Sequence, residues 1–173
     1  MKYIYCGFFF FTFLFNVFSQ ERKIIEAYRF QVSPKIDGII SEKEWKKIIP
    51  ATNFTLFQPE NRSGEEIPVG YETYVYFGYD DKAIYVAAQL NYPDPNNIPS
   101  EFSERDDMDA ISEKFLVSID TYDNTKERFT FFVTSSGGLI DGLNTGEFDE
   151  EGLRYNTLFD AKVQKNKRGW STE

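Results

Sequence analysis

Apolar and polar residues alternate with a period of two along the middle of this chain. The alternation covers residues 71–77 and again residues 84–90, and the polar residues Asp80, Asp81 and Lys82 lie between the two runs. Side chains that alternate in this way point to opposite faces of a strand. Two such runs joined by a short polar turn predict an antiparallel hairpin.

The same pattern recurs further along the chain. Residues 115–119 and 129–133 alternate around a polar loop at 120–126, and the turn sequence 135–138 leads into a short apolar run at 139–143. Gly and Ser residues between two alternating runs are typical of tight turns. This region therefore predicts three consecutive strands.

Further strands are expected near both ends. Residues 24–32, 54–58 and 159–163 carry strand-like patterns, and the last of these continues through a turn at 165–169 to Trp170. Many short strands separated by regular turns indicate a β-sandwich or a barrel. Because the runs have one apolar and one polar face, the predicted fold is all-β, an antiparallel, jelly-roll-like β-sandwich.

One short helix is expected to cover an end of the sheet. Ser41 and Glu44 have the spacing of a capping box. Trp45, Ile48 and Ile49 then share one face at helical spacing, and a proline follows. Trp45 and Trp170 are both expected in the core.

The first residues resemble a secretory signal peptide. Lys2 precedes a nearly continuous apolar run over 3–18, and Val17 and Ser19 have the small-residue spacing of a cleavage site. The alternative is an uncleaved anchor, but the run is shorter than the roughly 20 residues that a spanning helix needs. We expect a signal peptide at 1–19 and a mature domain at 20–173 without a membrane span. The domain is then exported to the periplasm, outer membrane or extracellular space.

Composition removes many kinds of chemistry. The chain has no histidine, a net charge of −9 and one cysteine, Cys6, which lies within the expected signal peptide. The mature domain therefore has no histidine or cysteine for a catalytic triad, a thiol nucleophile or a zinc site. The acidic balance disfavours nucleic acid and anionic lipid surfaces, both of which attract clustered Lys and Arg. A neutral partner or a cation fits better.

An acidic stretch and two loop tyrosines remain as candidate binding groups. The stretch from Glu101 to Glu113 can be a solvated loop, a structural calcium site or, less favoured, a catalytic carboxylate pair. Tyr122 stands beside Asp123 and Asn124, and Tyr155 is followed by Asn156, so each ring has short polar neighbours suited to a sugar. The alternative is that these rings serve packing. The calcium candidates are Asp106, Asp107 and Asp109.

The order of several short motifs resembles a family 9 carbohydrate-binding module. Within that family the chain is most similar to the variant that heads large envelope proteins of Bacteroidetes-type bacteria, before a further β-rich region. The resemblance implies a β-sandwich, glycan binding, sometimes bound calcium, and attachment to glycan-degrading enzymes. It implies a carbohydrate site at Arg105, Asp107, Tyr122, Tyr155 and Asn156. The motifs are Lys35-Ile36-Asp37-Gly38, Glu44-Trp45, residues 80–87, Arg105-Asp106-Asp107, Glu113-Lys114-Phe115, residues 119–122, residues 129–133 with Gly137-Gly138, and Gly169-Trp170.

Three functions are considered. The leading hypothesis is a non-catalytic carbohydrate-binding domain that tethers a downstream domain of the same chain to glycan during its breakdown. The second is an interaction or plug domain that packs on a downstream outer-membrane β-domain without a sugar ligand. The third is part of a glycoside hydrolase acting on O-glycosyl bonds. Because residues 169–173 begin a strand at the end of the sequence, the domain is expected to be truncated there.

Overall fold

The described residues form two β-sheets with almost no helix. The computed structural model describes residues 23–41, 43–123, 126–144 and 155–173. The predicted signal peptide and Asn124 lie outside these ranges. One sheet has the strand order β1-β2-β3-β8-β7 and the other the order β4-β5-β6. The elements are β1 (Tyr28–Arg29), η1 (Trp45–Lys47), η2 (Glu60–Arg62), β2 (Thr73–Tyr79), β3 (Ile84–Asn91), η3 (Pro95–Asn97), β4 (Lys114–Ile119), β5 (Arg128–Thr134), β6 (Leu139–Asn144), β7 (Val163–Asn166) and β8 (Gly169–Thr172).

The two predicted hairpins and the strand after them are confirmed. β2 pairs antiparallel with β3, and β5 pairs antiparallel with both β4 and β6. β8 lies between β3 and β7, antiparallel to both. The all-β, mainly antiparallel architecture is therefore confirmed, whereas the jelly-roll connectivity stays a prediction.

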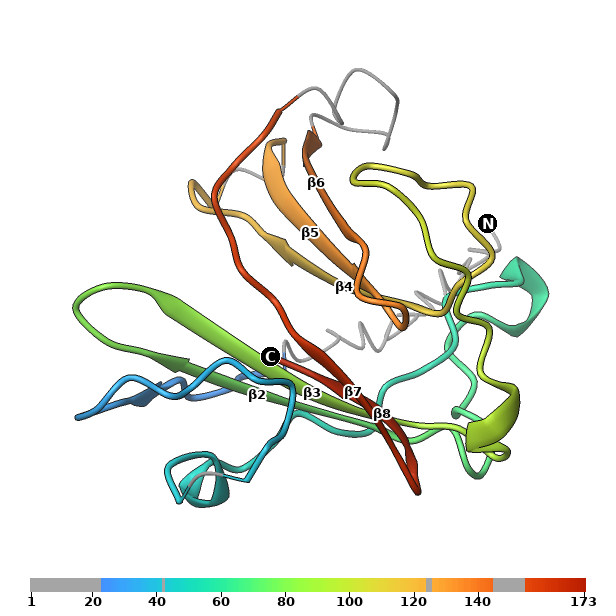
Figure 1. Cartoon of the computed structure of the whole chain (residues 1–173), viewed down its shortest axis with the longest axis horizontal. Helices are drawn as coiled ribbons and strands as arrows, with labels where there is room; N and C mark the ends of the chain where they lie inside the picture. Colours follow the sequence, from blue (N-terminus) through green and yellow to red (C-terminus); the bar gives the residue numbers. More distant parts are fainter. Residues whose placement is uncertain (1–22, 42, 124–125, 145–154) are drawn as a thin grey trace, which may run out of the picture.

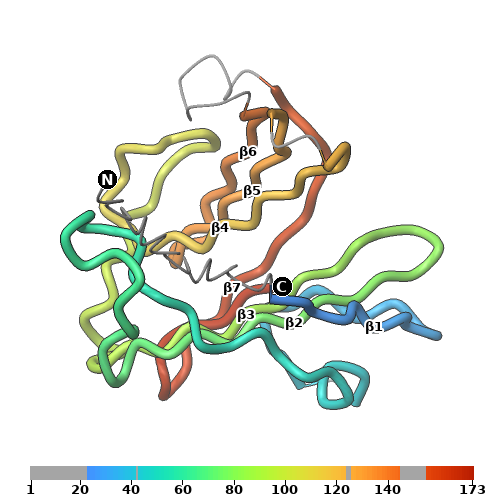
Figure 2. The backbone as a smooth tube through the Cα atoms, turned by 180° about the vertical axis from the view of Figure 1, so that it is seen from behind, coloured from blue at the N-terminus to red at the C-terminus, as the bar shows by residue number. Residues whose placement is uncertain are grey.

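The sheets lie one above the other. Figures 1 and 2 show β4, β5 and β6 on one side of the five-stranded sheet and the segment of roughly residues 30–50 on its opposite side. Val75, Ala88 and Trp170 are buried on the face toward the three-stranded sheet. The five-stranded sheet is thus the middle layer of the domain.

Two predictions about strands near the start of the chain are wrong. The strand expected over 54–58 is absent, and its place is taken by a loop with a single bridge between Thr55 and Glu66. Phe57 is exposed, so the apolar residues of this segment do not form the buried face of a strand. The strand expected over 24–32 is reduced to Tyr28–Arg29, and it runs parallel to β2. The antiparallel prediction is therefore wrong at this edge.

The expected helix is a single 3-10 turn. Its N-cap is Glu44 rather than Ser41, and no side chain caps it. Trp45 and Ile48 are buried, while Ile49 is 86% exposed. Residues three apart line up on one side of a 3-10 turn, which has three residues per turn, whereas a fourth residue does not. A single 3-10 turn is therefore enough to bury both Trp45 and Ile48.

A buried cluster joins the N-terminal segment to the last strand. Trp45 lies edge-on to Phe30, with ring centroids 4.9 Å apart, and packs against Ala87 of β3. Its indole N–H donates to Glu173 Oε1 at 2.7 Å, and the backbone N–H of Gly38 donates to Glu173 Oε2 at 2.9 Å. The Glu173 carboxylate therefore holds a loop that is more than a hundred residues away in sequence.

Gly38 can lie in this place because it has no side chain. Its φ is +80°, in the left-handed region, and a Cβ built on it would lie 2.9 Å from the carbonyl carbon of Val163 in β7. Backbone of this conformation and closeness favours glycine. The motif Asp37-Gly38 is thus explained by the docking of this loop against β7 and β8.

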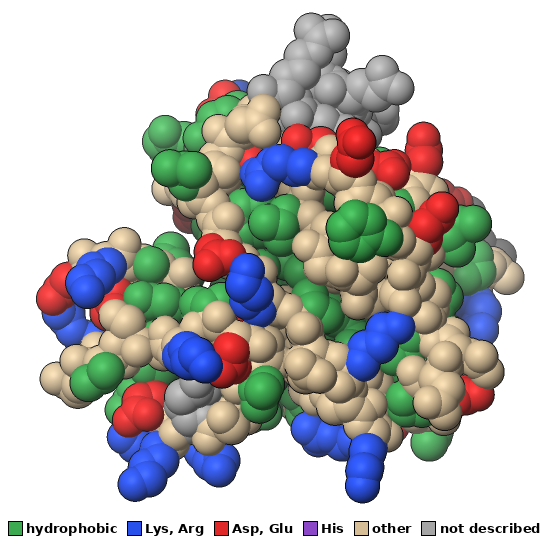
Figure 3. Space-filling model, viewed as in Figure 1, with side chains coloured by type: hydrophobic (Ala, Val, Ile, Leu, Met, Phe, Trp, Pro, Cys, Tyr) green, Lys and Arg blue, Asp and Glu red, His purple; other side chains and the backbone are tan. Residues whose placement is uncertain are grey.

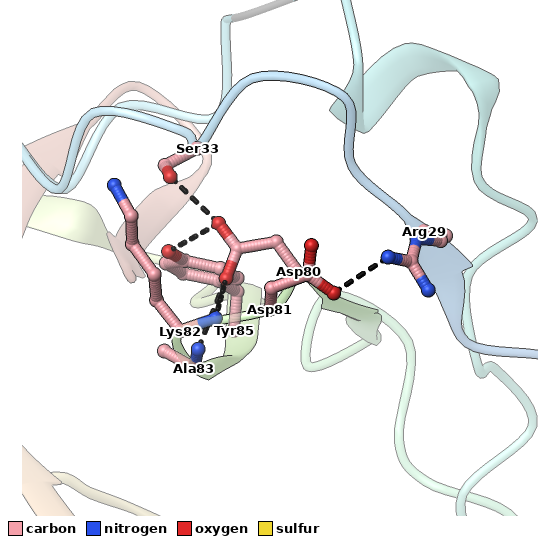
Figure 4. A network of polar contacts seen from close by, with 7 residues as sticks. All are labelled: Arg29, Ser33, Asp80, Asp81, Lys82, Ala83 and Tyr85. Carbon is pink, nitrogen blue, oxygen red and sulfur yellow. Dashed lines mark hydrogen bonds and ion pairs between the residues drawn. The ribbon is translucent and has the colours of Figure 1, made fainter.

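Asp80 organises the tip of the β2–β3 hairpin (Figure 4). Its carboxylate accepts hydrogen bonds from the Ser33 hydroxyl at 2.6 Å, the Lys82 backbone N–H at 2.7 Å and the Tyr85 hydroxyl at 3.0 Å. These donors, the Ser33 hydroxyl foremost, hold the pKa of Asp80 well below its usual range. The charged form of this one carboxylate therefore stabilises the turn predicted from Asp80-Asp81-Lys82.

Replacing Asp80 with asparagine is expected to lower stability at pH 7 and to have a smaller effect in acid. A carboxyl with a lowered pKa in the folded state stabilises the fold above its unfolded pKa of about 3.9. That stabilisation is lost as the pH falls through the folded pKa. Urea unfolding of the two proteins at pH 7 and pH 3 measures the difference. Asp81→Asn, which removes only the exposed pair with Arg29, is the control. A gap between Asp80→Asn and the parent that widens in acid would contradict this account.

Candidate functional site

Asp141 is a carboxylate near the middle of one strand of the three-stranded sheet. It belongs to the edge strand β6, lies opposite Phe131 of β5, and is completely buried. Its Oδ1 atom pairs with the Arg105 guanidinium, and its Oδ2 accepts the backbone N–H of Thr157 at 2.5 Å. A buried carboxylate needs a cation and hydrogen-bond donors around it, and Asp141 has both.

Residues 155–160, here called the strap, cross one face of this sheet. Tyr155 contacts Phe129 and Phe159 contacts Phe131, with ring centroids 5.3 Å apart in both pairs. Phe129 and Phe131 are two residues apart on β5, so they share one face. Figure 1 shows the strap descending past β4–β6 toward β7.

Arg105 fastens the strap. Besides Asp141, its guanidinium contacts the Thr157 carbonyl at 3.4 Å and lies 5.5 Å from the centroid of the Phe159 ring. Its Nε atom is 3.7 Å from Asp106, whose other oxygen accepts the backbone N–H of Asp141 at 3.3 Å. The contacts of the Arg105 guanidinium are thus with other residues of the domain. Through them, Arg105 holds the strap against the three-stranded sheet.

The structure brings together some of the predicted carbohydrate-binding residues. Arg105 contacts the segment that carries Tyr155 and Asn156. Tyr155 is 39% exposed, and Asn156 is also exposed. Tyr122, 67% exposed, lies in the loop between β4 and β5. That loop is at the same end of the sheet as Phe129, the ring under Tyr155. Tyr155 and Asn156 are called the strap surface below.

Asp107 is directed toward its own loop instead. Its Oδ1 accepts the backbone N–H groups of Asp109 and Ala110, at 3.0 and 3.2 Å, as an aspartate in a turn commonly does. Of the calcium candidates, Asp106 and Asp107 thus both engage the protein, and Asp109 is exposed. Within the described ranges, no three acidic, His or Cys side chains converge to hold a metal ion. The calcium site stays a prediction.

Sequence reasoning missed Asp141, although the pattern contained a signal. Leu139, Asp141 and Leu143 occupy alternate positions of one strand. A single charged residue on the apolar face of a strand requires a buried partner. The signal marks the position but not the partner, because Arg105 lies 36 residues earlier in a loop.

A groove at one edge of the five-stranded sheet is a second candidate. Its volume is about 350 Å³, and it lies between the start of β2 and two neighbouring loop segments. The residues that line it are Thr52, Asn53, Phe54, Thr55, Glu66, Ile67, Glu72, Thr73 and Tyr74. None of these residues belongs to the predicted site. The groove could not be seen in the sequence, because segments that are apart in the chain converge to form it.

Charge is unevenly distributed over the surface. On the face drawn in Figure 3, Asp and Glu side chains gather in the upper part, over the region of the three-stranded sheet, and Lys and Arg line the lower edge. An anionic ligand would be repelled from the upper part. In the part of the chain that the structure describes, no helix is long and apolar enough to cross a membrane.

In comparisons with known proteins, no family model, no curated protein and no solved structure matches this chain.

Proposed function

We propose that this chain is a non-catalytic carbohydrate-binding domain and that its glycan lies on the strap surface. The observation that carries the proposal is the exposed ring of Tyr155, which is fixed against Phe129 and adjoins the exposed amide of Asn156. The ring offers an apolar face to sugar C–H groups, and the amide offers both a donor and an acceptor to sugar hydroxyls.

The ion pair between Arg105 and the buried Asp141 supports this proposal through preorganisation. Arg105 and Asp141 both contact the backbone of Thr157, two residues after Tyr155, so the strap is held in place without a ligand. A binding surface that is ordered in advance loses less conformational entropy on binding. The net charge of −9 favours a neutral glycan over an acidic one.

The resemblance to family 9 modules and the expected signal peptide extend the proposal. The domain is exported and holds a downstream domain of the same chain close to glycan, which raises the local concentration of substrate. Structural calcium, if bound, would take its ligands from the loop of Asp106, Asp107 and Asp109.

Tyr155→Ala is expected to weaken glycan binding about tenfold, which corresponds to about 1.4 kcal/mol. Glycan-array screening followed by isothermal titration with soluble glucan, xylan and host oligosaccharides measures the effect. Tyr71→Ala is a matched control, because Tyr71 is 41% exposed and lies edge-on to Tyr92 at 5.2 Å, much as Tyr155 lies on Phe129. A flat response across all glycans, or equal losses in the two variants, would refute the proposal.

A further inference from the structure

The groove beside β2 arises where two extended segments separate. Ala51 and Val75 are joined by a backbone bridge, with N–H to C=O distances of 2.7 and 3.1 Å. Beyond it the chain at 52–55 leaves β2 and is bridged to Glu66 through Thr55. The opening between these bridges holds about 350 Å³, the lower end of the range of about 300–1,000 Å³ for small-molecule sites.

Backbone groups of β2 face this opening. Val75 directs its N–H and C=O toward Ala51, and in a strand the residue two positions away directs its own groups to the same side. Thr73 therefore turns its N–H and C=O into the groove. Among the described residues, no strand pairs with Thr73 on that side.

The side chains of the groove combine rings with hydroxyl and amide groups. Phe54, 40% exposed, and the half-buried Tyr74 supply the rings. Thr52, Asn53, Thr55 and Thr73 also line the groove, and their side chains make no hydrogen bond to another described residue. Unused hydroxyl and amide groups beside an apolar ring suit a polyhydroxyl ligand better than an apolar peptide side chain.

Two carboxylates limit the charge of such a ligand. Glu66 and Glu72 both line the groove. The Gly70 backbone N–H donates to Glu72 at 3.0 Å, and this donor, first among several, lowers the pKa of that carboxyl. The residues that line the groove include no Lys or Arg. Lys23 lies nearby, and its Nζ donates to the Asn53 carbonyl at 2.7 Å. Negative charge therefore exceeds positive charge around the opening.

We propose that this groove is a second carbohydrate site, separate from the strap surface, which takes a neutral sugar and rejects uronic acids. Phe54 and Tyr74 contact the sugar ring, the threonine hydroxyls and Asn53 bind its hydroxyls, and Glu66 repels a carboxylate on the sugar, whereas the Glu72 carboxylate is held by Gly70 and by Asn91 of β3. The proposal rests on the lining of the groove alone, so it can fail or hold independently of binding at Tyr155.

Titration of the isotope-labelled chain with neutral hexasaccharides of glucose, xylose and mannose, followed by amide NMR, tests the site. We expect at least one neutral hexasaccharide to shift the amide signals of residues 52–55, 66–67 and 72–74, and a galacturonic acid hexasaccharide to leave them unchanged. Shifts confined to the strap surface would overturn the groove proposal while leaving the proposed function standing. The absence of any groove shift at millimolar sugar would overturn it as well, as would movement of these amides by an extended peptide only.

Two variants separate the roles of ring and charge. Phe54→Ala should weaken neutral-sugar binding at least fivefold, whereas Phe57→Ala, which removes an 82% exposed ring outside the groove lining, should not. Glu66→Gln should keep neutral-sugar binding within twofold and increase galacturonate binding at least threefold. If galacturonate binds the parent chain as tightly as neutral sugar, or if Phe57→Ala matches Phe54→Ala, the proposal is wrong.

Discussion

Trp45→Ala is expected to lower the free energy of unfolding by about 3–5 kcal/mol, the usual cost of removing a large aromatic side chain from a core. Trp45 is completely buried, lies edge-on to Phe30 and Tyr76, and donates its indole N–H to Glu173. The variant loses this contact area and the hydrogen bond from the indole N–H to the Glu173 carboxylate. Urea unfolding followed by circular dichroism measures the change.

Ile49→Ala is the control for this variant. Ile49 lies four residues from Trp45 and is 86% exposed, so its loss should change stability by less than about 0.5 kcal/mol. A Trp45→Ala protein that unfolds within about 1 kcal/mol of the parent would mean that the N-terminal segment is not part of the cooperative core.

Arg105→Met is expected to cost about 3 kcal/mol, the lower end of the range for breaking a buried ion pair. The variant leaves Asp141 completely buried without its cation. The lower end applies because the Arg105 side chain is itself 39% exposed, so water can partly replace it. Chemical denaturation at pH 7 gives the magnitude, and loss of protection from hydrogen exchange at Thr157 would locate it.

Two comparisons distinguish the buried pair from an ordinary surface pair. Arg62→Met removes a similar arginine whose pair with Glu65 is about half exposed on both sides, and it should cost no more than about 1 kcal/mol. The double variant Arg105→Met with Asp141→Leu should recover part of the loss, because no charge is then left buried. A single variant no worse than Arg62→Met would show that Asp141 does not depend on Arg105.

The strands that could be predicted are those whose evidence is local. Alternation over 71–77 and 84–90 is complete within one hairpin, and β2 and β3 appear where it places them. The place of β8 between β3 and β7 could not be predicted in this way, since it depends on pairing across some eighty residues. For the same reason, nothing in the sequence near Phe54 predicts a groove whose other wall is residues 66–74.

The candidate site shows the same division. The Tyr155-Asn156 pair could be chosen because a ring next to a short amide is visible in the sequence. The partner that fixes Arg105 could not, because Asp141 joins it only through the register of β6. The prediction of a helix at Trp45 was wrong because the capping-box pattern and the i, i+3 spacing are both compatible with a single tight turn.

The position of β8 also has a consequence for how the domain is made. β8 is the last strand described and lies inside the five-stranded sheet, while its neighbour β3 is already paired with β2 near the middle of the chain. Residues are synthesised in order, so the side of β3 that pairs with β8 has no partner until residues 169–172 have been made. Exposed strand edges of this kind invite aggregation. The five-stranded sheet is therefore exposed to wrong pairing until β8 joins it, whereas the three-stranded sheet, built from consecutive hairpins, can pair fully without any later strand.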